Sequence, residues 1–166
     1  MADSALKAGD ILVADKLLGF DPDFGGSVIL LLAHGNSTVG INIASGHIRH
    51  NLFAGGPLRM PYPIALHAQA HSVAGSRPVG NSGYAITELD GFDVNEMEKK
   101  KNLVLAAGYA GWGPGQLETE IAQGVWKKVD GATLNELLAA EPADRWKIAT
   151  DKADAPQDKP APKSAQ

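Results

Sequence analysis

A glycine-rich stretch at residues 103–121 constrains the fold of this chain more than any other feature. Its sequence is LVLAAGYAGWGPGQLETEI, in which an apolar run at residues 103–107 precedes four glycines, namely Gly108, Gly111, Gly113 and Gly115. Glycine tolerates positive φ and the close approach of other groups, and proline suits the first position of a helix. The stretch therefore predicts a strand, a turn that carries Tyr109 and Trp112, and a helix that begins near Pro114.

Short apolar runs bounded by turn residues predict strands in the first half of the chain. Residues 11–14 and 27–34 are the first two, and the near-continuous apolar character of the second predicts burial on both faces. Three residues, 35–37, connect it to a strand at 38–44, which is the spacing of a hairpin. Pro61 and Pro63 oppose a helix between the later strands. Those strands are predicted at residues 51–54, 64–69, 84–87 and 126–129, with a turn at 21–23 and a loop at 71–83.

Helices are predicted mainly in the second half. Two runs have the spacing of a capping box, with an acid three residues after the cap: Asp93 to Glu96, which opens a helix to about residue 101, and Thr133 to Glu136. Pro142 opens a last helix. The helix after the glycine-rich stretch should bury the face formed by Leu117, Ile121 and Val125 and end at Gly124.

The order of these elements indicates an α+β fold, because strands outnumber helices and the helices cluster late. A length of 166 residues corresponds to about one domain, which we place at residues 1–150. Residues 151–166 contain three prolines and no Leu, Ile, Val or aromatic residue. Such a segment cannot bury enough apolar surface to offset its ordering entropy, so we expect a disordered C-terminal tail.

Charge and composition argue against several classes of function. The formal net charge is -4, which disfavours a dedicated nucleic-acid surface, since duplex binding relies on Lys and Arg. Cysteine is absent, which excludes disulfides and thiolate chemistry. The N-terminus does not resemble a signal peptide. The longest apolar run, residues 28–33, is far shorter than the ~20 residues that span a bilayer. We therefore expect a cytoplasmic protein without direct DNA or membrane contact.

The glycine-rich stretch is the candidate binding site. A strand, a glycine turn and a helix N-terminus together can bind an anion through backbone N–H groups. Neither common phosphate fingerprint is complete, because Gly-Lys-Ser/Thr is absent and Glu118 stands where a dinucleotide loop has its third glycine. The alternative is structural, with the glycines permitting a sharp turn while Tyr109 and Trp112 pack over the sheet.

Other chemical groups give weaker signals. His67 and His71 share a face in either secondary structure, but zinc needs a third ligand, so no metal site or cofactor is predicted. Glu118 and Glu120 diverge on a helix and are not an acid–base pair. Gln116 and Glu120 share a helix face, where they either bind a polar ligand or are solvated. Arg145 pairs either with an acid or with an aromatic face.

The block GYAGWGPGQLE at residues 108–118 resembles the signature of the bacterial YqgE/AlgH family. Other landmarks of the family occur in the same order, at residues 21–24, 54–57, 66–67, 126 and 145–146. The resemblance covers about residues 9–150. It implies a mixed, branched pseudo-barrel sheet with helices packed outside, and an indirect link to gene regulation. One departure is the Asn-Ile-Ala-Ser-Gly run at residues 42–46, which lacks the basic side chain expected from the family.

These observations lead us to expect a non-enzymatic protein that binds a small polar ligand or a protein partner. The alternative is an enzyme that acts on a phosphorylated or other anionic small molecule at residues 108–115. In either case we expect the glycine-rich stretch to line a surface concavity beside the Gly55-Gly56-Pro57 turn, because loops held by a sheet often form binding sites. The predicted ligand-binding residues are Gly55, Gly56, His67, Gly108, Tyr109, Gly111, Trp112, Gly115 and Gln116.

Overall fold

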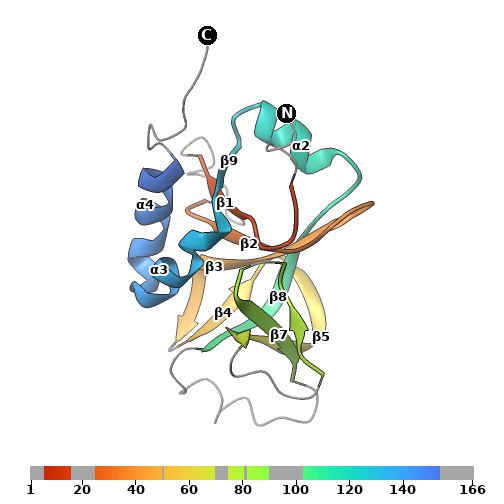
Figure 1. Ribbon diagram of the computed structural model, residues 1–166, viewed down its shortest axis with the longest axis vertical. Helices are drawn as coiled ribbons and strands as arrows, with labels where there is room; N and C mark the ends of the chain where they lie inside the picture. The colour runs from red at the N-terminus through yellow and green to blue at the C-terminus, as the bar shows by residue number, and fades with distance from the viewer. Residues whose placement is uncertain are drawn as a thin grey trace.

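A single nine-stranded sheet, curled into half a barrel, forms the framework of the protein (Figure 1). The computed structural model describes residues 6–15, 25–49, 51–69, 75–80, 82–89 and 103–153. Within these ranges the elements are β1 (Ile11–Ala14), β2 (Val28–His34), β3 (Thr38–Arg49), β4 (Leu52–Gly55), β5 (Leu58–Ala68), β6 (Arg77–Pro78), β7 (Tyr84–Glu88), β8 (Leu103–Trp112), α2 (Gln116–Ala122), β9 (Trp126–Val129), the 3-10 turn η4 (Gly131–Thr133), α3 (Leu134–Ala139) and α4 (Pro142–Ala153).

The sheet is mixed and branched, as predicted. Its strand order is β6-β7-β5-β8-β4-β3-β2-β1-β9, with an additional pairing between β8 and β3. The short β4 lies between β3 and β8 and runs parallel to β8, whereas the other described pairs are antiparallel. Beyond the end of β4, β3 and β8 pair directly, with Val39 opposite Gly111. The branch therefore arises because β4 is shorter than its two neighbours.

Alternate residues of β2 face two separate cores. Val28 and Leu30 belong to a larger core shared with α3 and α4, and Ile29 and Leu31 belong to a smaller core beneath α2. All four side chains are fully buried, which confirms the burial predicted for both faces of this strand. The predicted apolar face of α2 also packs into the smaller core, and Gly124 follows the end of that helix with φ 83°.

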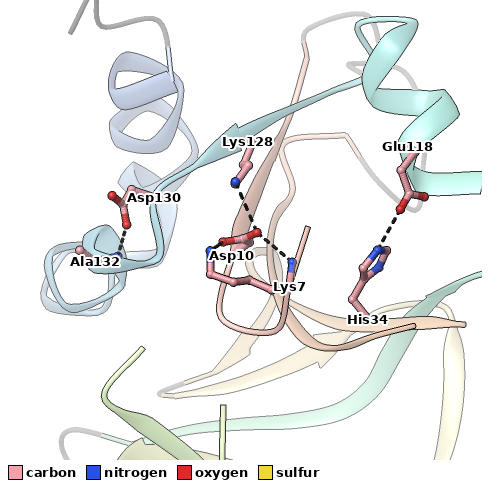
Figure 2. A network of polar contacts seen from close by, with 7 residues as sticks. All are labelled: Lys7, Asp10, His34, Glu118, Lys128, Asp130 and Ala132. Atoms are coloured by element: carbon pink, nitrogen blue, oxygen red, sulfur yellow. Dashed lines mark hydrogen bonds and ion pairs between the residues drawn. The ribbon is translucent and has the colours of Figure 1, made fainter. Parts of the chain in front are cut away.

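The N-terminal segment 6–10 joins parts of the structure that are far apart in sequence. The N–H of Gly9 donates to the carbonyl of Leu31 at 2.8 Å. Gly80, before β7, lies so close to the carbonyl of Ala8 that it has no room for a Cβ. The same is true of Gly131, after β9, beside the carbonyl of Gly9. The segment thus lies between the β6–β7 hairpin and η4. Figure 2 shows Asp10, at its end, between Lys7 and Lys128.

The predicted glycine turn is wrong in its first part. Strand β8 continues through Gly108 and Gly111 to Trp112, and neither glycine has positive φ. The turn is confined to residues 113–115, where Gly115 has φ 72°, and α2 begins at Gln116 rather than at Pro114. Strand pairing on both sides of β8 accounts for the difference, because β3 and β5 hold the glycines in extended backbone.

Strand β5 is also longer than predicted, since it begins at Leu58 and passes through Pro61 and Pro63. The pairing of β5 with β8 shifts register between Arg59 and Ile64. Both prolines fall inside that interval, where a strand tolerates the loss of a backbone N–H. The loop predicted at 71–83 contains the two-residue strand β6.

Two predictions about the C-terminal helices need correction. Thr133 does not cap α3 with its side chain, because η4 leads directly into that helix, and Asp130 caps η4 instead by accepting from the N–H of Ala132 at 2.9 Å (Figure 2). Helix α4 continues past residue 150 to Ala153, and Lys152 pairs with Glu136 at 3.2 Å. The predicted turn at 21–23, the helix from residue 93 to 101, His71 and tail residues 154–166 lie outside the described residues.

Candidate functional site

The two glycine stretches singled out in the sequence meet in the structure. Gly55, which ends β4, and Gly56, which follows it, have φ 81° and 151°, and their α-carbons lie against the backbone of Gly108 and Tyr109 in β8. A Cβ on Gly108 would lie 2.6, 2.8 and 2.9 Å from the carbonyl oxygens of Leu58, Ala54 and Gly56. Backbone atoms therefore fill the space beside these glycines, and we call this contact the glycine crossing.

An apolar patch lies next to the glycine crossing. A Cβ on Gly111 would lie 3.1 Å from Cδ1 of Leu58 and 3.8 Å from Cε2 of Tyr109. Val39 is paired with Gly111 and so points to the same side of the sheet. Leu58 is 44% exposed, and Ile48, at 53%, is the other large hydrophobic side chain exposed in the described part of the chain. The apolar patch consists of Val39, Leu58, Tyr109 and Gly111.

Gln116 and Glu120 form a hydrogen-bonded network with two tryptophans. Oε1 of Glu120 accepts from the indole N–H groups of Trp112 at 3.0 Å and Trp126 at 2.9 Å. Its Oε2 accepts from Nε2 of Gln116 at 3.0 Å, and Oε1 of Gln116 accepts from the N–H of Gly113 at 3.0 Å. The pair is therefore neither simply solvated nor free to receive a ligand without giving up these bonds. Trp112 and Trp126 are buried.

The start of α2 has a negative side chain rather than a free anion site. Figure 2 shows His34 reaching from the end of β2 toward Glu118 on α2, with 2.9 Å between Nε2 and Oε2. Nδ1 of His34 lies 2.6 Å from Oγ1 of Thr38. The carboxylate of Glu118 places a negative charge in the first turn of α2, where it would repel an anionic ligand. The arrangement disfavours the phosphorylated substrate considered from the sequence.

His67 lies apart from the other predicted site residues. It is paired with Leu103 on β8, five residues from Gly108, so about 17 Å of strand separates His67 from the glycine crossing. Its imidazole is 7% exposed and contacts the carbonyl of Ala68 at 3.1 Å and Oγ1 of Thr87 at 2.7 Å. Sequence analysis did not identify Thr87, because the register of β5 and β7 is not visible in the sequence.

Arg145 is buried against an aromatic ring, which decides between the two alternatives left open by the sequence. Its guanidinium carbon lies 5.4 Å from the centre of the Phe53 ring. Its N–H groups donate to the carbonyl oxygens of Ile43 at 2.8 Å, Ala140 at 3.2 Å and Leu138 at 3.3 Å. Burial lowers the pKa of Arg145, and the negative charge of Glu141 partly opposes that effect. The side chain serves to fix α4 on β3.

The described ranges are also informative about metal ions and membranes. Among those residues, no group of three or more His, Cys, Asp or Glu side chains is placed to hold a metal ion. No helix within them is long and apolar enough to cross a membrane.

The chain resembles known proteins along most of its length. A UPF0301 protein of Myxococcus xanthus is 31% identical over 159 residues, which covers 84% of this chain and 86% of that protein. A UPF0301 protein of Xanthomonas axonopodis is 29% identical over 164 residues, with 86% of each chain covered. The names of these relatives state neither a ligand nor a reaction.

Solved structures show the same fold. A crystal structure of a Corynebacterium diphtheriae protein superposes with a TM-score of 0.62 at 27% identity, covering 86% of this chain and 81% of that chain. The solution structure of AlgH from Pseudomonas aeruginosa superposes with a TM-score of 0.65 at 19% identity, covering 95% of both chains. Residues 11–157 match the family model described as AlgH-like. The chain therefore belongs to the AlgH-like family.

Proposed function

We propose that this protein binds another protein, which contacts it at the apolar patch. The observation that carries the proposal is the exposure of Leu58, which is 44% accessible beside a glycine that leaves the strand surface open. Burying the exposed part of a leucine contributes roughly 1 kcal/mol to association. A partly apolar strand surface of this kind suits a protein partner.

A small polar ligand is less well supported at the same place. Residues 110–112 of β8 pair with β3, and residues 108 and 109 pair with β5, so much of the backbone hydrogen bonding there is used within the sheet. The N–H of Gly113 donates to Gln116. The predicted ligand-binding roles of the glycines and of Trp112, Gln116 and His67 stay predictions. The surface concavity also stays a prediction.

Any regulatory role of the protein would depend on this contact with another protein. The formal net charge of -4 gives little attraction for DNA phosphates. We expect a salt-titrated DNA-binding assay to find no sequence-specific affinity at physiological ionic strength, and binding with a steep salt dependence would overturn this part of the proposal. A cytoplasmic location also remains an expectation.

Site-specific photo-cross-linking tests the contact directly. A photoreactive phenylalanine analogue at position 58 should yield a defined cross-linked protein in cells, which mass spectrometry would identify. The matched control is the same analogue at Ile48, the other exposed large hydrophobic residue. Ile48 lies near the end of β3, beside the start of β4, whereas Leu58 begins β5 after the other end of β4. We expect no common product from the two positions.

Purified components then give the strength of the contact. Leu58→Ala should weaken binding of the identified partner by about five-fold, which corresponds to the loss of roughly 1 kcal/mol. Ile48→Ala should leave the affinity unchanged. If both variants bind alike, or if the cross-linked products are the same at both positions, the apolar patch is not the contact. Chemical-shift mapping with a metabolite mixture tests the small-ligand alternative, which shifts confined to residues 55–57 and 108–116 would favour.

A further inference from the structure

Three side chains form a hydrogen-bonded row that links a half-buried serine to a buried histidine. Nε2 of His67 on β5 lies 2.7 Å from Oγ1 of Thr87 on β7, and the same oxygen lies 2.8 Å from Oγ of Ser76, just before β6. His67 and Thr87 are 7% and 6% exposed. Ser76 is only partly buried. The row therefore runs from the protein surface inward.

The fourth group in the row fixes the direction of every hydrogen bond. The carbonyl oxygen of Ala68 can only accept, so Nδ1 of His67 must carry the hydrogen of that 3.1 Å bond. In the neutral imidazole Nε2 is then the acceptor, and Thr87 donates to it. Since the hydroxyl hydrogen of Thr87 is used there, its oxygen accepts from the hydroxyl of Ser76. The hydroxyl hydrogen of Ser76 therefore points along a path that ends at a base.

A hydroxyl, a base within hydrogen-bond reach and a group that orients the base are the three parts of an activated nucleophile. Here the hydroxyl of Thr87 stands between nucleophile and base as a relay, and the carbonyl of Ala68 orients the imidazole. We propose that Ser76 is a nucleophile that accepts an acyl group from an ester or other acyl compound with a good leaving group. This site lies outside the apolar patch and does not depend on the binding function proposed above.

The proposed step conserves every proton. Oγ of Ser76 forms a bond to the acyl carbon as its hydrogen passes to Thr87, and the hydrogen of Thr87 passes to Nε2 of His67. The bond between the acyl carbon and the leaving oxygen then breaks, and the leaving group takes up the proton that His67 returns through the same path. Water then attacks the acyl carbon as its hydrogen passes to Thr87 and the hydrogen of Thr87 passes to His67. The bond between the acyl carbon and Oγ of Ser76 breaks, the acyl group leaves as a carboxylic acid, and Oγ regains a hydrogen through the same path.

A second hydroxyl–imidazole pair in the structure lacks access. Glu118 accepts from Nε2 of His34, so Nδ1 of the neutral imidazole accepts from the hydroxyl of Thr38 at 2.6 Å. Thr38, however, is only 2% exposed, which leaves no room for a substrate. Ser76 combines accessibility with a base among the described residues. Ser82, which is also partly buried, instead accepts from the N–H of Tyr84 at 3.1 Å.

Acylation of the full-length protein by p-nitrophenyl acetate tests the proposal. Peptide mapping by mass spectrometry should find an acetyl group on Ser76, acquired faster than on Ser82. Thr87→Val and His67→Gln should each slow acetylation of Ser76 at least about ten-fold, because general-base assistance is typically worth more than that. Thr87→Ser should restore the rate to within a few-fold, since it restores the relay hydroxyl. Ser82→Ala is the matched control and should not change labelling of Ser76.

Several results would overturn the proposal. They are equal labelling of Ser76 and Ser82 in the wild-type protein, unchanged labelling of Ser76 in Thr87→Val, and failure of Thr87→Ser to react faster than Thr87→Val. Circular dichroism establishes whether each variant is folded. If Thr87→Val does not fold, the comparison of Ser76 with Ser82 in the wild-type protein and in His67→Gln still decides the question.

Discussion

Substitution of Gly108 by alanine should be among the most damaging single-methyl additions in the chain. The new Cβ would lie 2.6–2.9 Å from three carbonyl oxygens, whereas ordinary contacts begin near 3.4 Å. The backbone of β4, β5 or β8 must therefore move by roughly 0.5–0.8 Å to admit it, which is the difference between those distances. Because all three neighbours are backbone atoms, no side chain can rotate away to relieve the overlap.

The expected loss of stability follows from two opposing effects. Overpacking a well-packed site costs typically about 1–3 kcal/mol, and three backbone contacts place Gly108 at the upper end. Replacing glycine by alanine also restricts the unfolded chain, which returns about 0.4–1 kcal/mol. The net loss should be roughly 2–3 kcal/mol, which for a chain of this size lowers Tm by about 4–12 °C.

Two neighbouring glycines provide internal controls for the assay. A Cβ on Gly113 would find its nearest neighbour, Oε1 of Gln116, at 3.9 Å, so Gly113→Ala should be neutral or stabilising by up to about 1 kcal/mol. The new Cβ of Gly111→Ala would lie 3.1 Å from the flexible end of Leu58. Its effect on stability should therefore fall between those of Gly108→Ala and Gly113→Ala. Thermal and urea unfolding, followed by circular dichroism, measure all three variants. If Gly108→Ala and Gly113→Ala unfold within a degree or two of each other, the glycine crossing does not require its glycine.

Three further predictions concern other parts of the fold. Glu120→Ala removes the acceptor of two indole N–H groups and should lower the free energy of unfolding by roughly 1–3 kcal/mol for each. The near-ultraviolet circular dichroism spectrum should change as well. Glu118→Ala, the control, should lower the free energy of unfolding by only about 0–1 kcal/mol. Burial raises the pKa of Tyr84 above 10.0, so the contribution of its hydroxyl, which donates to Asn135, is complete below pH 10.0 and is lost as pH rises through the raised pKa. The difference in Tm between wild type and Tyr84→Phe should therefore shrink as the pH rises through the raised pKa of Tyr84. A difference that stays constant would show that the hydroxyl of Tyr84 does not contribute to stability in this way. Deleting residues 154–166 should change Tm by no more than a degree or two, whereas deletion from residue 151 onward should lower it further, because Ala153 packs on the larger core and Lys152 pairs with Glu136.

Much of the fold was predictable because local pattern and tertiary environment agree. Short apolar runs bounded by turn residues predicted the strand at 11–14 and the hairpin between β2 and β3, and helical spacing predicted the apolar face of α2. The family resemblance supplied the branched form of the sheet, which periodicity does not predict. The match over residues 11–157 confirms that resemblance.

The glycine-rich stretch was misinterpreted because glycine has two uses that look alike in sequence. One use is positive φ in a turn, which applies to Gly115. The other is close backbone contact within a sheet, which applies to Gly108. The choice depends on Gly55 and Gly56, about fifty residues earlier, whose contact with Gly108 exists only in the folded chain. Sequence analysis did place the two stretches side by side.

The candidate site was less predictable than the fold. His67 was predicted to bind a ligand, yet its described partners are a carbonyl on the same strand and Thr87 on the neighbouring strand β7. Thr87 and Ser76 carry no motif, and their proximity depends on the register of β5, β6 and β7. The role of Glu120 as a shared acceptor was equally hidden, because it requires both tryptophans to approach one helix from different strands.

The placement of the N-terminal segment has a consequence for how the chain folds during synthesis. Residues 6–10 leave the ribosome well before Gly131 and β9, which hold them and β1 in place and follow more than a hundred residues later. The hydrogen bond between Trp146 and the carbonyl of Ala14 spans 132 residues. Contacts of such long range make folding slow. Until β9 emerges, the outer edge of β1 is an open strand edge, which nascent chains on neighbouring ribosomes or a chaperone can pair with.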